Sequence, residues 1–248
     1  MVTAIAGLGT PESEWQLWPG LHRLPPLDLA GCERVVLLAP HPDDEILGVG
    51  GLLRLLSARG AAITLVAVTD GEASHPLSPT VTPKRLAALR RAESLAALGI
   101  LGLEHVTVHR LGIGDGGVAA AERAVEAAIV DIVGKASGTW CLSTWDGDGH
   151  PDHEAVGRAA RAASRRCDVR LLSYPIWTWH WALPGDPRVP WPQARSIVLD
   201  DETLVAKRAA IDCFVTQIRA LSPDPEDAPV LTGPMLNRLC RPMEVVFI

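Results

Sequence analysis

The chain has 248 residues, of which 48% are hydrophobic and 21% are charged, so it can bury the core of a single α/β domain. Its 23 lysines and arginines against 29 aspartates and glutamates give a formal net charge of -6, which disfavours nucleic acid as a partner. We therefore expect one globular domain and no nucleic-acid ligand.

The cysteines and the hydrophobic runs exclude further classes. The five cysteines are widely spaced without a Cys-x-x-Cys pair, so neither a disulfide framework nor a zinc site of sulfur ligands is indicated. The first ten residues carry no Lys or Arg ahead of an apolar segment, and no apolar run approaches the ~20 residues that span a bilayer. We expect a cytoplasmic protein without a membrane span.

The first regular elements follow an irregular lead-in at residues 1–30. Arg34–Ala39 is a short apolar, β-branched run, which is typical of a strand buried on both faces. Residues 46–59 place leucines at helical spacing and stop at a glycine, and residues 62–68 form a second apolar run. These segments predict a β-α-β unit.

The alternation continues along the chain. Helical patterns at 84–98, 118–133 and 154–165 alternate with strand-like runs at 105–111, 139–144 and 169–174. This order predicts an α/β, Rossmann-like three-layer sandwich with a mostly parallel sheet, as one domain over residues 1–248. In such folds ligands bind beyond the carboxyl ends of the strands, so the loops after residues 39, 68, 111 and 144 are the candidates for function.

A dense polar loop follows the first predicted strand, with the sequence Pro40-His41-Pro42-Asp43-Asp44-Glu45. Carboxylates this close repel one another unless a cation neutralises them, and imidazole with carboxylate is a ligand set that zinc accepts. The alternative is a polar loop in which Asp44 or Glu45 only caps the following helix. This loop alone does not decide between the two.

A second polar loop, Asp146-Gly147-Asp148-Gly149-His150-Pro151-Asp152-His153, follows a later strand and would open onto the same edge of the sheet. His150 and His153 are three residues apart at a helix entrance, so one can bind a metal while the other faces a reacting group. The alternative is a helix cap at Asp152 with two solvated histidines. Together, the two loops favour a metal site.

Both loops resemble the motifs of a known family. Pro-His-Pro-Asp-Asp-Glu at 40–45, with His-Pro-Asp-His at 150–153, is similar to the LmbE-like (PIG-L) family of zinc-dependent N-deacetylases. Weaker similarities are Thr69-Asp70-Gly71-Glu72, Arg90-x-x-Glu93, Asp115-Gly116, Lys207 and Gln217. The resemblance covers roughly residues 34 to 220.

The resemblance implies roles for the residues of both loops. His41, Asp44 and His153 would bind one zinc ion per chain. Asp43 would be the general base, and His150 would stabilise or protonate the tetrahedral intermediate. The chemistry agrees, because three protein ligands leave a coordination position at which zinc lowers the pKa of bound water to about 7.

The resemblance also implies a substrate, namely a small N-acylated amino sugar or glycoconjugate whose sugar would contact Arg90 and Asp115. One position departs from the family. Some deacetylases of thiol biosynthesis have a tyrosine two residues before His150, whereas this chain has Asp148, so a role for that tyrosine does not transfer.

The C-terminal part, residues 175–248, is rich in tryptophan and is expected to shape the substrate pocket. Trp177, Trp179 and Trp181 stand at alternate positions, so an extended backbone would present all three on one face. Such a platform suits a sugar ring or an acyl chain. The alternative is that the indoles pack against the sheet edge or in the interface of a homo-oligomer.

Three functions stay open at this point. The leading hypothesis is a zinc-dependent N-deacetylase that removes an N-acyl group, most simply acetyl, from an amino sugar. The metal chemistry alone would also allow hydrolysis of a different amide or an ester. A catalytically inactive sugar- or nucleotide-binding module is the third candidate, although binding alone does not need a base such as Asp43 beside the metal.

Overall fold

The computed structural model describes residues 7–135 and 137–248. Within them, the strands are β1 Arg34–Ala39, β2 Ala62–Ala67, β3 Thr107–Arg110, β4 Thr139–Thr144, β5 Arg170–Tyr174, β6 Ala194–Val198 and β7 Met243–Phe247. The helices are α1 Glu12–Leu17, α2 Pro19–His22, α3 Asp44–Ala58, α4 Pro83–Ile100, α5 Val118–Val133, α6 Pro151–Cys167, α7 Thr178–Trp181, α8 Asp201–Ile211, α9 Val215–Ile218 and α10 Gly233–Leu239.

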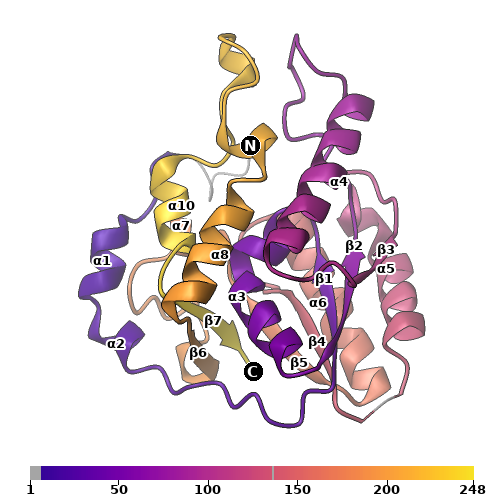
Figure 1. The fold of residues 1–248 in the computed structure, drawn as a ribbon, viewed down its shortest axis with the longest axis vertical. Helices are drawn as coiled ribbons and strands as arrows, with labels where there is room; N and C mark the ends of the chain where they lie inside the picture. The colour runs from indigo at the N-terminus through magenta and orange to yellow at the C-terminus, as the bar shows by residue number, and fades with distance from the viewer. Residues whose placement is uncertain (1–6, 136) are drawn as a thin grey trace.

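The strands form one seven-stranded sheet in the order β3-β2-β1-β4-β5-β7-β6 (Figure 1). The five strands from β3 to β5 pair in parallel, whereas β7 runs antiparallel to both β5 and β6. This confirms the predicted α/β fold with a mostly parallel sheet. The strand order reverses between β1 and β4: β2 and β3 follow on one side of β1, and β4 and β5 on the other. Since β1 and β4 are parallel neighbours, the loops that follow them lie at the same edge.

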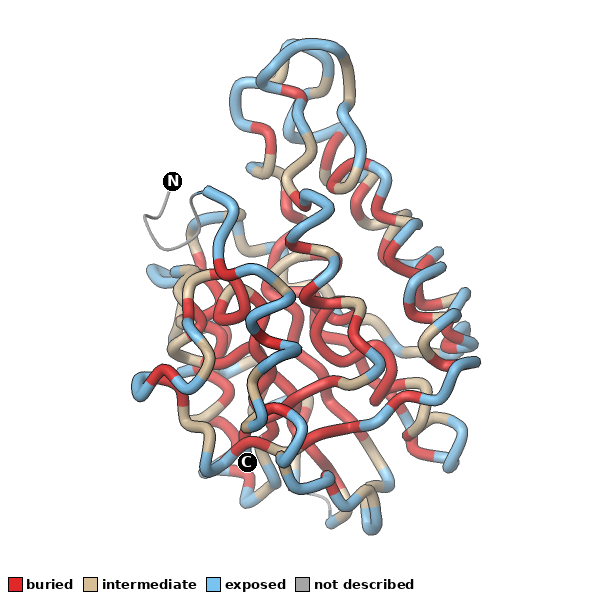
Figure 2. The backbone as a smooth tube through the Cα atoms, turned by 90° about the vertical axis from the view of Figure 1, so that its left-hand side faces the viewer, coloured by how far each residue is buried: buried red, intermediate tan, exposed pale blue. Residues whose placement is uncertain are grey.

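Helices cover both faces of the sheet. Val36 and Leu38 of β1 are fully buried against α5 and α6, while Val35 and Leu37 are fully buried on the opposite face, which α3, α4 and α8 cover. Successive side chains of a strand point to opposite faces, so an uninterrupted apolar run is what a strand between two helical layers requires. Figure 2 shows the buried interior that results.

The N-terminal segment is more regular than the sequence indicated. Residues 10–30 include the short helices α1 and α2 instead of an irregular lead-in, and residues 1–6 lie outside the described part of the chain. Trp15 of α1 is fully buried, and its indole N–H donates to the carbonyl of Trp179 at 3.0 Å. The segment is therefore fixed to the C-terminal part of the chain.

The expectation of one flat tryptophan face at residues 177–181 is wrong, because Thr178–Trp181 is a helical turn and not an extended strand. The turn sends the three side chains in different directions. Trp179 packs edge-on against Trp15 with ring centroids 5.0 Å apart, whereas Trp181 lies under the guanidinium of Arg188. Trp177 and Trp181 are partly exposed, and Trp177 and Trp179 line a small pocket with residues of α10.

None of the helices in residues 7–135 and 137–248 combines the length and the apolar character that crossing a bilayer requires.

Candidate metal centre

Three side chains from the two polar loops converge at the carboxyl edge of the sheet. His41 Nδ1 lies 3.4 Å from Asp44 Oδ2 and 3.3 Å from His153 Nε2, and the last two atoms are 3.2 Å apart. His41 follows β1, Asp44 is the first residue of α3, and His153 lies in the first turn of α6 after β4. The neighbouring strands β1 and β4 thus bring together residues that are 112 positions apart.

The triangle of these three atoms has the dimensions of one face of a zinc site. Zinc binds nitrogen and oxygen ligands at about 2.0–2.1 Å, and the edge of a tetrahedron with that radius is about 3.4 Å. All three edges come within about 0.2 Å of that length. The residues present therefore fit a divalent metal ion, and His150 also has a ring nitrogen within 4.8 Å of nitrogens of His41 and His153.

Carboxylates contact the ring nitrogen of each imidazole that does not belong to the triangle. Asp148 Oδ2 accepts a hydrogen bond from His153 Nδ1 at 2.8 Å, which leaves Nε2 of that ring free to face a metal. His41 Nε2 lies 3.1 Å from Asp115 Oδ1 and 3.4 Å from Asp152 Oδ2. Such contacts fix the ring orientation and the tautomer of a metal-binding histidine.

Asp148 is itself fixed by the chain that follows β5. Its carboxylate, fully buried, accepts the backbone N–H groups of Ile176, Trp177 and Thr178 at 2.9–3.0 Å. The sequence analysis missed this role, and the only signal for it was a carboxylate in the second loop. The contact was not foreseeable because it joins two loops about 30 residues apart.

The charges of the cluster are strongly coupled. Burial alone would raise the pKa of Asp44, but the neighbouring imidazoles of His153 and His41 hold it well below its usual range. Burial opposes the protonation of His153, yet the carboxylates of Asp44 and Asp148 raise its pKa to about 9. The site is thus built to concentrate positive charge between carboxylates, as a cation site requires.

Asp43 lies beside the triangle in an unusual backbone conformation, with φ 133° and ψ -31°. A residue other than glycine is strained there, and such strain persists only where the surroundings impose it. The Asp43 carboxylate accepts from Arg90 Nη2 at 3.0 Å, and its N–H donates to Glu45 at 3.0 Å. Burial raises the pKa of Asp43 to about 7, although Arg90 opposes the shift.

Glu45 anchors this turn. Besides accepting the N–H of Asp43, its carboxylate accepts a hydrogen bond from Ser94 of α4 at 2.6 Å. Glu45 is fully buried and therefore has no path to a substrate.

His150 faces the triangle from the residue before α6. Its Nδ1 accepts the backbone N–H of Asp152 at 3.2 Å, so the proton of the neutral ring resides on Nε2. Burial lowers the pKa of His150 to about 4, and the nearby imidazoles of His153 and His41 act in the same direction. The ring is therefore neutral and offers an N–H donor.

Arg90 and Asp115, for which the resemblance implies contact with the sugar, make hydrogen bonds to other residues of the protein. Arg90 is 3% exposed and donates to the carbonyls of Gly71 and Pro42 as well as to Asp43. A Cβ on Gly71, which has φ +66°, would stand 1.9 Å from the Arg90 guanidinium, so the loop closes tightly over this side chain. The structure thus places Arg90 behind the predicted base rather than at an open surface.

Asp115 also has protein partners. Besides its contact with His41 Nε2, it accepts the N–H of Ala73 at 2.9 Å. Burial alone would raise its pKa, but the hydrogen bond with His41 lowers it to about 2. Its side chain is 11% exposed, so it reaches solvent only slightly.

Comparison with known proteins places both loops within one family match. The family model for PIG-L, described as GlcNAc-PI de-N-acetylase, matches residues 36–164, which include both loops. The chain belongs to the PIG-L family. The family match ends within α6, so the C-terminal part that fixes Asp148 lies beyond it.

Two curated relatives of this PIG-L protein carry the same description, 1D-myo-inositol 2-acetamido-2-deoxy-alpha-D-glucopyranoside deacetylase. The one from Streptomyces avermitilis is 34% identical over 211 residues, with 72% of this chain and 71% of the relative covered. The one from Corynebacterium diphtheriae is 26% identical over 230 residues, with 77% and 78% covered. The solved structure of the A40926 pseudoaglycone deacetylase Dbv21 has a TM-score of 0.60 at 22% identity, covering 87% of this chain and 96% of that one, which shows the shared fold.

Proposed function

We propose that this PIG-L protein is a zinc-dependent hydrolase that removes an N-acyl group, most simply acetyl, from an amino sugar or a glycoconjugate. The observation that carries the proposal is the triangle of His41, Asp44 and His153, with edges of 3.2–3.4 Å and the buried carboxylate of Asp43 beside it. The amino-sugar substrate is supported by the two relatives, whose described substrate is an acetamido sugar joined to inositol.

The residues of the site divide the work of amide hydrolysis. A bound zinc ion, one per chain, would supply a Lewis acid that polarises the acyl carbonyl and lowers the pKa of water. Asp43 accepts the proton of the attacking water, and the neutral His150 donates its Nε2–H to the oxyanion. When the C–N bond breaks, the proton held by Asp43 passes to the leaving nitrogen, so the products are an amine and a carboxylate.

The strained backbone of Asp43 favours a catalyst over an inactive binding module. Three hydrogen-bonding groups, from Arg90, Glu45 and the first turn of α3, hold this residue in a conformation that costs about 1–3 kcal/mol. A site that only binds a sugar has no use for a carboxylate held in this way. Hydrolysis of an amide outside the sugars, or of an ester, needs the same groups and is distinguished by its products.

We also propose that residues 175–248 form one domain with the rest of the chain and select the substrate. A cavity of about 10 Å³, too small for a sugar, lies between α7 and α10, with the lining residues Ile176, Trp177, Trp179, His180, Leu231, Met235, Arg238 and Leu239. Ile176 and Trp177, which line this cavity, also donate their backbone N–H groups to Asp148. Asp148 in turn holds the ring of His153, so the cavity and the metal centre share this carboxylate. Arg90 and Asp115 act in this proposal through Asp43 and His41.

The proposal is tested by metal analysis of the purified protein together with a screen of N-acetylated amino sugars. We expect close to one zinc per chain and chelator-sensitive release of acetate with a matching amount of free amine. Esters of the same sugars serve as the control for the alternative reaction. A protein without bound metal, or one that hydrolyses only esters, would contradict the proposal.

We expect His150→Ala to slow turnover by about 10²-fold or more while zinc content stays unchanged, because the oxyanion loses a donor but the three ligands remain. Steady-state kinetics with elemental analysis of the same preparation measure both quantities. Loss of zinc in this variant would show that His150, and not His153, completes the ligand set.

A further inference from the structure

Helix α3 is broken one turn after the residue that begins it. Val49 has φ -141° and ψ 18°, which are not helical values, so Asp44–Ala58 consists of two helical segments joined at a kink. The first segment carries Asp44, with Asp43 directly before it. A regular helix would have fixed the direction of this turn by its own hydrogen bonds, and a broken helix needs another support.

A buried ion pair occupies the position of a helical hydrogen bond at this break. In a regular helix the N–H of Gly51 would donate to the carbonyl of Leu47. Here the N–H of Gly51 donates to Glu244 Oε1 at 2.7 Å, and the carbonyl of Leu47 accepts from Lys207 Nζ at 2.9 Å. Lys207 Nζ also lies 2.7 Å from Glu244 Oε1, and Glu244 Oε2 accepts the N–H of Leu52 at 2.8 Å.

The charges of the pair match the two helix ends that meet here. A carboxylate is stabilising at a helix N-terminus, and Glu244 accepts the first N–H groups of the second segment. An ammonium group is stabilising at a helix C-terminus, and Lys207 donates to a carbonyl at the end of the first segment. Both side chains are 1% exposed. They come from β7 and α8, so elements remote in sequence from α3 define how its two segments join.

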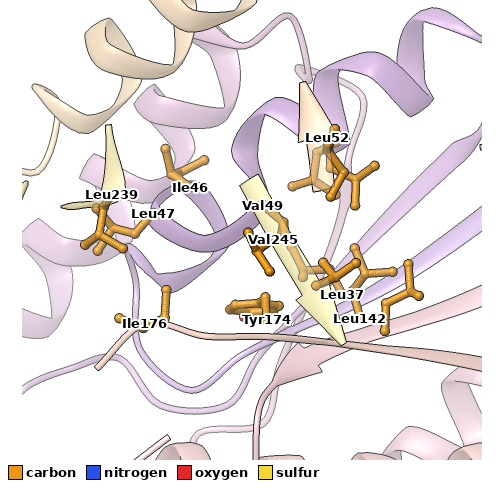
Figure 3. Close-up of a cluster of buried hydrophobic side chains, with 14 of the residues drawn as sticks. Leu37, Ile46, Leu47, Val49, Leu52, Leu142, Tyr174, Ile176, Leu239 and Val245 are labelled. Carbon is orange, nitrogen blue, oxygen red and sulfur yellow. The ribbon is translucent and has the colours of Figure 1, made fainter. Parts of the chain in front are cut away.

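Close packing prevents the two segments from sliding. A Cβ on Gly48 would stand 2.3 Å from the ring of Tyr174, and a Cβ on Gly51 would stand 2.5 Å from Leu199. Figure 3 shows the side chains around the break, where Ile46, Leu47, Val49 and Leu52 of α3 lie in one cluster with Tyr174 and Val245. Packing thus fixes the sides of α3, and the ion pair bridges the break itself.

We propose that Lys207 and Glu244 are positioning residues for the reaction, because their ion pair sets the pose of the turn that carries the metal ligand Asp44 and the base Asp43. This inference rests on the proposed function of that turn. Neither side chain touches metal or substrate, so their effect has to appear in the geometry of the bound metal and in turnover, and not in substrate affinity.

The test replaces the pair by neutral side chains of similar size in the double variant Lys207→Met/Glu244→Gln, which leaves no unpaired buried charge. We expect kcat to fall about 10- to 100-fold with KM unchanged. In the cobalt(II)-substituted protein, the visible absorption spectrum, which reports ligand number and geometry, should differ from that of the parent. The variant Glu244→Asp keeps the charge but withdraws the carboxylate from α3, and it should shift both readouts in the same direction.

A matched control applies the same chemical changes to the largely buried ion pair of Arg241 and Glu12, whose side chains are 6% and 13% exposed and which joins α1 to the C-terminal part of the chain. The double variant Arg241→Met/Glu12→Gln should lose thermal stability but keep the parent's kcat and cobalt spectrum. Parent-like kcat and spectrum in folded Lys207/Glu244 variants would overturn the inference, as would equal losses in the control. Failure of the proposed function would appear earlier, as a parent protein without metal or deacetylase activity.

Discussion

Asp43→Asn is expected to reduce kcat/KM by about 10²–10⁴-fold while the protein keeps its zinc. The amide cannot accept a proton from water, yet its oxygen still accepts the hydrogen bond that Arg90 donates at 3.0 Å. Asparagine also has almost the same size and shape as aspartate, so the turn at φ 133° should survive the change. Kinetics and elemental analysis of one preparation provide the measurement.

The variant Arg90→Lys is the comparison for Asp43→Asn, because it separates loss of the carboxylate from loss of its support. Lysine keeps the positive charge but cannot reproduce the three hydrogen bonds of the guanidinium, so this variant disturbs the support and leaves the carboxylate in place. A smaller loss is therefore expected than in Asp43→Asn. If Asp43→Asn hydrolyses the substrate at the parent's rate, Asp43 has no part in proton transfer.

His153→Ala has the second large effect, and we expect it to weaken zinc binding more than about 100-fold, with loss of activity in proportion. The substitution removes one corner of the ligand triangle. The fold should persist, because Asp148 keeps its hydrogen bonds from the backbone of residues 176–178. Competition with a chromogenic chelator measures the affinity, and circular dichroism verifies the fold.

His75→Ala is the matched control for this variant. His75 is also buried, at 5% exposed, but it contacts the carbonyl of Ala228 and Ser74 rather than the triangle. The His75→Ala variant should keep the parent's zinc affinity. Equal loss of zinc from both variants would indicate a general effect of removing a buried imidazole.

Sequence patterns predicted the parallel part of the fold well. The bounds expected for β1, β4 and α5 agree with those observed, because these elements read as continuous apolar runs or as a helical stripe between clear stop signals. β6 and β7 were not predicted. They are short, lie at the edge of the sheet and pair antiparallel with partners that their own sequence does not reveal.

The site was predictable as a set of residue types but not as a geometry. Parallel strands ending at one edge made it reasonable to expect that His41 and His153 meet. By contrast, the positive φ of Asp43 arises from tertiary contacts with Arg90 and with the turn that Glu45 anchors, and local sequence does not encode such contacts. The same holds for Asp148, whose partners arrive from a segment beyond β5.

One carboxylate, that of Asp148, holds both a metal-binding ring and the start of the tryptophan-containing segment. Exchanging that segment between relatives to obtain a new acceptor specificity will therefore also alter metal affinity, unless the backbone donors at 176–178 are kept in register. Chimeras should be joined after Thr178. New substrate specificities on this scaffold face the same constraint, since the backbone donors at 176–178 have to stay in place while other residues of the segment vary.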